Sequence, residues 1–279
     1  DSVPDDAALV LVAAPSKDIT DAEAEKLNAY LDNGGNISLL MSPNGGAFAY
    51  TNLEAIMKDY GFYMDYDRVS ETNSNYHISG DKYTIQCELN ELDDDSEATD
   101  LTSSLLNQGL YTFMPESRSF RYNDEGGKYT IAPLITTYDS AEGEPYGGIS
   151  DDPEKQSGQM LLAADSTSIA RNDSKMVVFG NAEFIDDEHV SDDTVIVPVY
   201  LFLSTISWMY DSDIDMEIST KSTTNDYISL QELRFGERIS FEMNCDSRCA
   251  ACELPKFTLQ PIVENSIVHG MRSRSAGGR

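Results

Sequence analysis

The chain has 279 residues, of which 49 are acidic and 19 are basic, so its formal net charge at pH 7 is −30. This length is enough for one large domain or two ordinary ones. A negative charge of this size repels nucleic acid and anionic membrane surfaces, so we expect neither of them as a partner.

The first elements read as a strand, a helix and a second strand. Residues 7–14 form a continuous apolar run, which is typical of a central parallel strand buried on both faces. Thr20 followed by Glu23 is the pattern of a capping box, and Gly34 with Gly35 ends the helix that begins there. Residues 37–41 are the next buried strand. This β-α-β order predicts a right-handed crossover in a parallel sheet.

A glycine-rich loop, Ser42–Gly46, follows the second strand. Loops at the carboxyl ends of strands are where open α/β sheets hold their ligands, so this is the position to examine for a binding site. The loop lacks the spacing of a phosphate-binding loop, and Ser42 lacks the glycines of a nucleophile elbow. A glycine-rich turn is therefore the preferred interpretation.

The remaining elements of the first part continue the same alternation of helices and strands. Helices are expected at 52–60 and 194–210, the second with Pro198 in its first turn, where proline is tolerated. The expected strands are 62–69, 83–87, 110–114, 129–138, 160–164 and 176–179, with a long flexible loop at 139–157. The predicted fold class is α/β, with a mostly parallel sheet flanked by helices.

Two groups of side chains in this part could suggest a metal site or a catalytic dyad, but a structural explanation fits each of them better. The acidic run 91–95, with Glu97 and Asp100, lacks the order of ligands in an EF-hand, and a solvated acidic loop explains it better than calcium. A dyad of Cys87 and His77 would need an activated thiol, but Cys87 lies in a polar region of the sequence. We expect no catalytic residue and no metal site here.

Several segments, in the same order, resemble the GldG-like auxiliary proteins of ABC transporters. They are the opening VPDDAALVLVAAPSKDITDAEAEKLNAYLDNGGNISLLMSP, then IAPLITTYDSA, then KMVVFGNAEFIDD, and finally STISWM. The resemblance covers about residues 3–221. It implies a flavodoxin-like or glutamine-amidotransferase-like sheet without an agreed catalytic centre, held outside the membrane by a permease-associated subunit.

The composition changes where this resemblance ends. Residues 1–217 hold 42 acidic and 11 basic side chains, whereas residues 219–279 hold 7 and 8. Three of the four cysteines also lie in this last part. A break of this size predicts a domain boundary.

The tail resembles sensor histidine kinases of the LytS/YesM type. The residues that carry the resemblance run from NDYISLQELRFGERI to LPKFTLQPIVENSIVHGM, over about residues 225–279. In that family Glu264 and Asn265 would lie in the N-box of the ATP site, where the Asn265 amide oxygen would bind the nucleotide's Mg²⁺. The glycine-rich boxes and the phospho-accepting histidine are missing from this sequence. We therefore expect these two residues to be non-functional, with no cofactor bound.

The tail cysteines allow three interpretations. Cys245, Cys249 and Cys252 have the spacing of a radical-SAM cluster, but the barrel which that chemistry needs is absent. Zinc with His269 as a fourth ligand is a second interpretation. A variable linker before the segment that begins at Pro255 is the simplest one.

Together these observations predict two domains, 1–221 and 222–279, in a piece of a longer protein. The predicted function is a non-enzymatic extracytoplasmic domain of an ABC-transporter auxiliary subunit that binds permease or ATPase subunits, or a surface glycan. The alternative is a fragment of a sensor histidine kinase whose acidic domain is the sensor. The parent of the first domain would be membrane-anchored and the parent of the tail cytoplasmic. The join near Thr223 is either engineered or a natural recombination.

Overall fold

The computed structural model describes residues 2–4, 6–92, 96–106, 112–123, 127–149, 155–186 and 196–210. The chain divides into two units at Ser212, and all of the described residues belong to the first unit. No helix within these ranges is long and apolar enough to cross a lipid bilayer.

The predicted β-α-β unit is present at the start of the chain. It consists of β1 (Leu9–Ala13), α1 (Asp21–Asp32) and β2 (Asn36–Leu40), with the two strands parallel. The capping box forms as expected, since Thr20 accepts a bond from the Glu23 amide and the Glu23 carboxylate accepts one from the Thr20 amide. Local sequence signals therefore fix this unit.

The rest of the large sheet does not follow the predicted fold class. Its strands run in the order β1-β2-β13-β12-β9-β6-β5, and only the pairs β1/β2 and β2/β13 are parallel. The pairs β13/β12, β12/β9, β9/β6 and β6/β5 are antiparallel. The sheet is mixed and mostly antiparallel, because the later strands are joined without crossover helices. The prediction of a mostly parallel, flavodoxin-like or amidotransferase-like α/β fold is wrong.

The longest strands among the described residues are β6, β9 and β12. The bounds of the strands not yet given are β3 (Phe62–Met64), β4 (Asp67–Glu71), β5 (His77–Ile78), β6 (Asp81–Leu89), β7 (Thr112–Met114), β8 (Phe120–Tyr122), β9 (Tyr129–Thr137), β10 (Ala141–Pro145), β11 (Gln156–Ser157), β12 (Leu161–Ser168) and β13 (Ser174–Phe179). The helical elements are α2 (Thr51–Lys58), α3 (Ser103–Leu106), η1 (Ile169–Arg171), η2 (Glu183–Ile185) and α4 (Ile196–Tyr210).

The strand at residues 7–14 was expected at the centre of the sheet, but β1 lies at its edge. Val10 and Val12 pack on the core beneath α1 and α2, whereas Leu11 on the other face is 45% exposed. A continuous apolar run is compatible with a strand at the centre of a sheet and with one at its edge. The position of β1 could therefore not be derived from the hydrophobic pattern.

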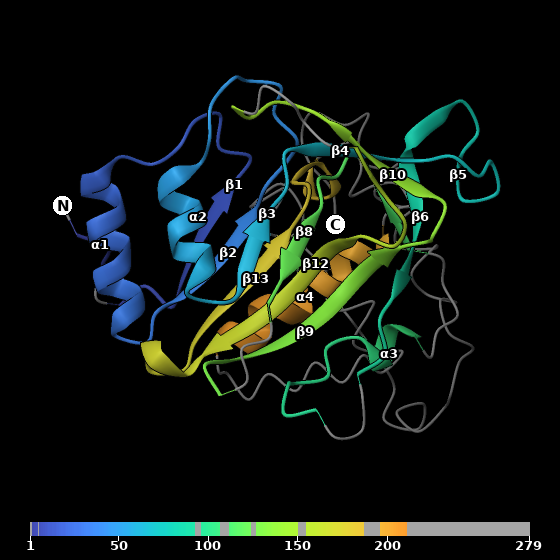
Figure 1. The fold of residues 1–279 in the computed structure, drawn as a ribbon. Helices are drawn as coiled ribbons and strands as arrows, with labels where there is room; N and C mark the ends of the chain where they lie inside the picture. Colours follow the sequence, from blue (N-terminus) through green and yellow to red (C-terminus); the bar gives the residue numbers. More distant parts are fainter. Residues whose placement is uncertain are drawn as a thin grey trace, which may run out of the picture. The chain divides into compact units, whose positions relative to one another are not determined.

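Helices cover both faces of the sheet (Figure 1). A hydrophobic core cluster joins α1 and α2 to one face, through residues such as Leu31, Ile56 and Val178. The neighbouring strand residue Phe179 faces the other way, where its ring meets Phe202 of α4 at 5.9 Å between centroids. Alternation along β13 therefore assigns one face to α1 and α2 and the opposite face to α4.

A small second sheet occupies part of the segment predicted as a flexible loop. Its order is β11-β10-β4, and both pairs are antiparallel. Residues 141–145 and 156–157 are therefore strands, and the prediction of an irregular loop over 139–157 is wrong for them. The strand predicted at 62–69 is likewise divided, since β3 joins the large sheet and β4 the small one.

Candidate functional site

The predicted ligand loop Ser42–Gly46 lies at the carboxyl end of β2, and other parts of the chain cover it. The Asn44 side-chain oxygen accepts a bond from the Gly46 amide at 2.9 Å, which closes the turn. The Gly148 amide donates to Gly46 O at 3.1 Å. Gly147 has a φ of +82°, and a Cβ at this position would lie 2.0 Å from Asn44 O. The loop is therefore packed against the segment after β10.

Arg118 fills the space beside this loop. Its side chain is fully buried and donates to Ser42 O at 3.0 Å and to Asp65 O at 3.4 Å. Its Nε has no hydrogen-bond partner among the described residues. Burial lowers the pKa of the guanidinium, and the charge of Asp67 opposes that shift. Arg118 thus occupies the position where an open α/β sheet would hold an anionic ligand.

Two tyrosines close the same edge of the sheet. The rings of Tyr50 and Tyr66 each lie 5.6 Å from the Arg118 Cζ. The Tyr50 hydroxyl donates to Pro15 O at 2.6 Å, and the Tyr66 hydroxyl donates to Glu54 while accepting from the Tyr50 amide. Burial and the Glu54 carboxylate raise the pKa of Tyr66. Both phenols therefore stay protonated and serve as structural bridges.

The structure does not assemble the Cys87–His77 dyad. The Cys87 thiol is buried and donates to Ile85 O at 3.5 Å, and burial raises its pKa. His77 faces Ile85 in the strand register, and its Nδ1 lies 2.8 Å from Ile78 O. A thiol whose pKa is raised is a poor nucleophile. Cys87 is best explained as a core residue of β6.

The predicted N-box residues Glu264 and Asn265 lie outside the described residues. The same holds for the three tail cysteines and for His269. That Glu264 and Asn265 are non-functional, and that the cysteines lie in a variable linker, therefore stay predictions.

Sequence reasoning missed the buried carboxyl group of Asp165 in β12. Its side chain is 1% exposed, and its Oδ2 has no hydrogen-bond partner among the described residues. In register it lies beside Val177 of β13 and Ala132 of β9, on the face covered by α4. Burial raises its pKa well above the usual value. The available signal was a carboxylate inside the apolar run LLAAD.

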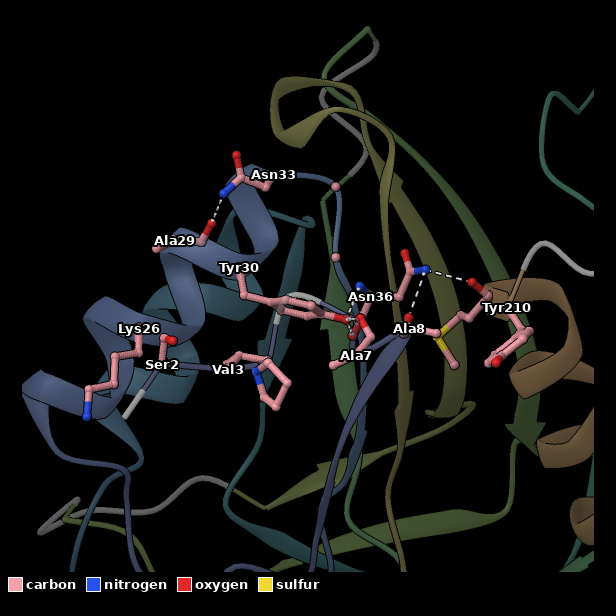
Figure 2. Close-up of a pocket in the computed structure, with 14 residues that line it drawn as sticks. Ser2, Val3, Ala7, Ala8, Lys26, Ala29, Tyr30, Asn33, Asn36 and Tyr210 are labelled. Atoms are coloured by element: carbon pink, nitrogen blue, oxygen red, sulfur yellow. Dashed lines mark hydrogen bonds between the residues drawn. The ribbon is translucent and has the colours of Figure 1, made fainter.

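A pocket of about 630 Å³ lies at the opposite end of the parallel strands, next to the amino ends of β1 and β2. Its walls come from the segment before β1, the second half of α1 and the last turn of α4. Figure 2 shows Tyr30 reaching from α1 toward Ala7 and Asn36. The Tyr30 hydroxyl lies 3.2 Å from Ala7 O and accepts from the Asn36 amide at 3.1 Å. The tyrosine thus ties the helix to β2 and to the segment before β1, and it forms the floor of the pocket.

The amide of Asn36 ties the same pocket to α4. Its Nδ2 donates to Met209 O at 2.6 Å, and Met209 and Tyr210 complete the wall. Lys26 and Asn33 stand on the α1 side of the opening. Apolar atoms and polar groups both line this pocket, which suits one side chain or small group with an apolar body and a polar end.

Comparison with known proteins agrees with the mixed sheet. The sequence model of the IFT52 GIFT domain family matches residues 2–85. Among solved structures, the mmIFT52 N-terminal domain is similar with a TM-score of 0.52 at 18% identity, and the match covers 75% of this chain and 79% of that chain. An identity this low shows a shared fold alone.

A short stretch of the chain is similar to sensor histidine kinases. Over 45 residues it is 40% identical to the sensor histidine kinase YesM of Bacillus subtilis, and over 45 residues it is 44% identical to the sensor protein LytS of the same organism. Each match covers 16% of this chain and 8% of the kinase. The resemblance to this kinase class is therefore confirmed, but only over a short length.

These comparisons overturn the predicted function. Residues 2–85 match the sequence model of the IFT52 GIFT domain, and the fold is similar to that of the mmIFT52 N-terminal domain, so the assignment of the first domain as a GldG-like auxiliary subunit of an ABC transporter is wrong. The alternative, a kinase fragment with the acidic domain as its sensor, is overturned as well, because the kinase matches span only 45 to 52 residues of the chain.

Proposed function

We propose that residues 2–210 form a non-catalytic domain that binds a basic protein partner. The observation that carries this proposal is that the chain's own side chains fill the carboxyl ends of the parallel strands β1, β2 and β13. Arg118, Tyr50 and Tyr66 occupy the place where open α/β sheets hold substrates, and they hydrogen-bond to the chain's own groups. Cys87, the cysteine that lies within the described residues, is buried, and burial keeps its thiol protonated.

The charge of the domain supports the class of partner. Residues 1–217 carry 42 acidic and 11 basic side chains. A field of this sign speeds association with cationic surfaces and slows association with acidic ones. The likeness in fold to the GIFT domain of an intraflagellar transport protein is compatible with a domain that works by binding.

Peptide display on the full immobilised chain tests the binding. Selection from a random twelve-residue library should enrich peptides with a net positive charge. Their affinity should fall steeply between 0.1 M and 1 M salt, where the Debye length shrinks from about 10 Å to about 3 Å. The same peptides with every Lys and Arg replaced by Glu serve as controls.

Three results would overturn the proposal. The first is that no peptide is enriched, and the second is that enriched peptides are neutral or acidic and insensitive to salt. The third is saturable binding to a neutral glycan on an array, with no peptide bound. Fluorogenic ester, phosphate and glycoside substrates complete the test, because we expect no turnover above that of the heat-denatured chain.

A further inference from the structure

The edge strand β1 presents unused backbone groups. The Ala14 amide donates to Leu40 O, which directs the peptide groups of alternate residues Val10 and Val12 toward β2. The amides and carbonyls of Leu9, Leu11 and Ala13 therefore point away from the sheet. None of these three residues has a hydrogen-bond partner on that side within the described part of the chain.

This edge lacks the features that protect the opposite one. The other end of the sheet is β5, which has two residues and an irregular register with β6. By contrast, β1 has the sequence LVLVA, without a proline, a charge or a bulge. Leu11 projects from it with 45% of its surface exposed. Proteins normally block a regular apolar edge, because it pairs readily with another strand.

The pocket lies next to the amino end of the edge strand β1. It is lined by Ala7 and Ala8, the two residues that directly precede β1, and it offers about 630 Å³. A strand that runs along β1 and continues past Leu9 reaches this opening. An added strand gains affinity from main-chain hydrogen bonds and specificity from pockets for single side chains, and both are present here.

The charge around β1 selects the partner. Residues 6–32 expose the five carboxylates of Asp6, Asp21, Glu23, Glu25 and Asp32, of which Asp32 pairs with Arg171, against the two lysines Lys17 and Lys26. A second copy of the chain would bring its own net charge of −30, so self-pairing is disfavoured. A segment with basic residues beside an apolar centre complements this surface.

We propose that β1 is a docking site for an extended basic segment of a partner protein, which adds to the sheet as an eleventh strand and anchors one side chain, with an apolar body and a polar end, in the pocket between α1 and α4. This proposal rests on the proposed function and adds to it the place and the form of binding.

The probes are the basic peptide KVTVKFRV and an analogue with N-methyl groups on alternate residues, measured by calorimetry with the full chain. N-methylation removes main-chain donors on one edge of the peptide and leaves its charge unchanged. We expect the unmodified peptide to bind and one of the two N-methyl registers to lose at least tenfold in affinity. Hydrogen exchange at the amides of residues 9–13 should slow in the complex.

Two matched pairs of variants locate the site on the protein. Leu11→Lys should weaken binding by tenfold or more, whereas Ile169→Lys, which makes the same change at a site 54% exposed on η1, should change it less than twofold. Ala29→Trp fills the pocket and should also weaken binding, whereas Ala22→Trp lies elsewhere on α1 and should not.

The outcomes separate the two proposals. If the wild-type chain binds the basic peptide but both N-methyl registers and Leu11→Lys bind equally well, the docking site on β1 is refuted and the proposed function stands. If neither this peptide nor any displayed basic peptide binds the wild-type chain, the proposed function is refuted as well. The N-methyl peptides keep the test decisive even if Leu11→Lys folds poorly.

Discussion

The buried carboxyl group of Asp165 gives the domain a pH-dependent weakness. The side chain is 1% exposed, and the helix α4 that covers its face, IVPVYLFLSTISWMY, has no charged residue. Lys175 on the adjacent strand directs its Nζ to Trp208 O at 2.8 Å. Burial raises the pKa of Asp165, and its Oδ2 has no hydrogen-bond partner among the described residues, so the folded state favours the protonated carboxyl.

The sign of the effect follows from linkage. The unfolded chain ionises this group above about pH 4, while the folded chain still holds the proton, so stability falls as the pH rises toward the folded pKa. Asp165→Asn removes the ionisable group, so folding no longer takes up a proton at this position. The variant side chain keeps the shape of the carboxyl group. As the pH rises through this window, the free energy of unfolding of the variant minus that of the wild type should therefore increase by about 1.4 kcal/mol per pH unit.

Urea unfolding at pH 4.5 and pH 5.5 measures this gain, with the fluorescence of Trp208, the single tryptophan, as the probe. Asp6→Asn makes the same charge change at an exposed position and is the control. A difference between Asp165→Asn and the wild type that is equal at the two pH values would refute the reasoning.

Three further predictions concern local structure. Thr20→Ala should cost about 1 kcal/mol in urea unfolding, because it removes the cap of α1, and Thr20→Ser should restore it; equal loss in both variants would contradict the capping role. Cys87 should resist iodoacetamide in the native chain and react in concentrated urea, as peptide mass mapping would show; rapid native labelling would contradict its burial. Gly147→Ala should cost more than Gly80→Ala, since both have positive φ but only the first adds a clash with Asn44 O, with strain of about 1–3 kcal/mol; equal thermal shifts would contradict the packing of the Ser42–Gly46 loop.

Local signals in the sequence predicted local structure well. The capping box at Thr20, the glycines after α1 and the apolar face of α1 lie within a few turns of one another, so the β-α-β unit could be derived from them. The apolar helix containing Pro198 in its first turn is likewise present as α4. In both cases the determining contacts lie close together in sequence.

Long-range pairing could not be derived in this way. The sequence does not indicate that β2 pairs with β13, so the edge position of β1 and the mostly antiparallel sheet were both missed. The strands within 139–157 form because β10 pairs with the backbone of β4, not because of their own composition. The same limit applies to the site.

Arg118 belongs to no motif, since it stands between two serines in a short polar stretch. Its importance comes from Ser42 and Asp65, which distant parts of the chain bring to it.

The pairing of β2 with β13 also sets the order in which the domain can be completed during synthesis. Strand β2 ends at Leu40, whereas β13 begins at Ser174, so one side of β2 stays unpaired while everything between them is translated. At about 5–20 residues per second this interval lasts roughly seven to thirty seconds. During that time Ile37 and Leu39 lack their neighbours Met176 and Val178. Strand β2 is therefore paired on one side only, with β1, until β13 has been made.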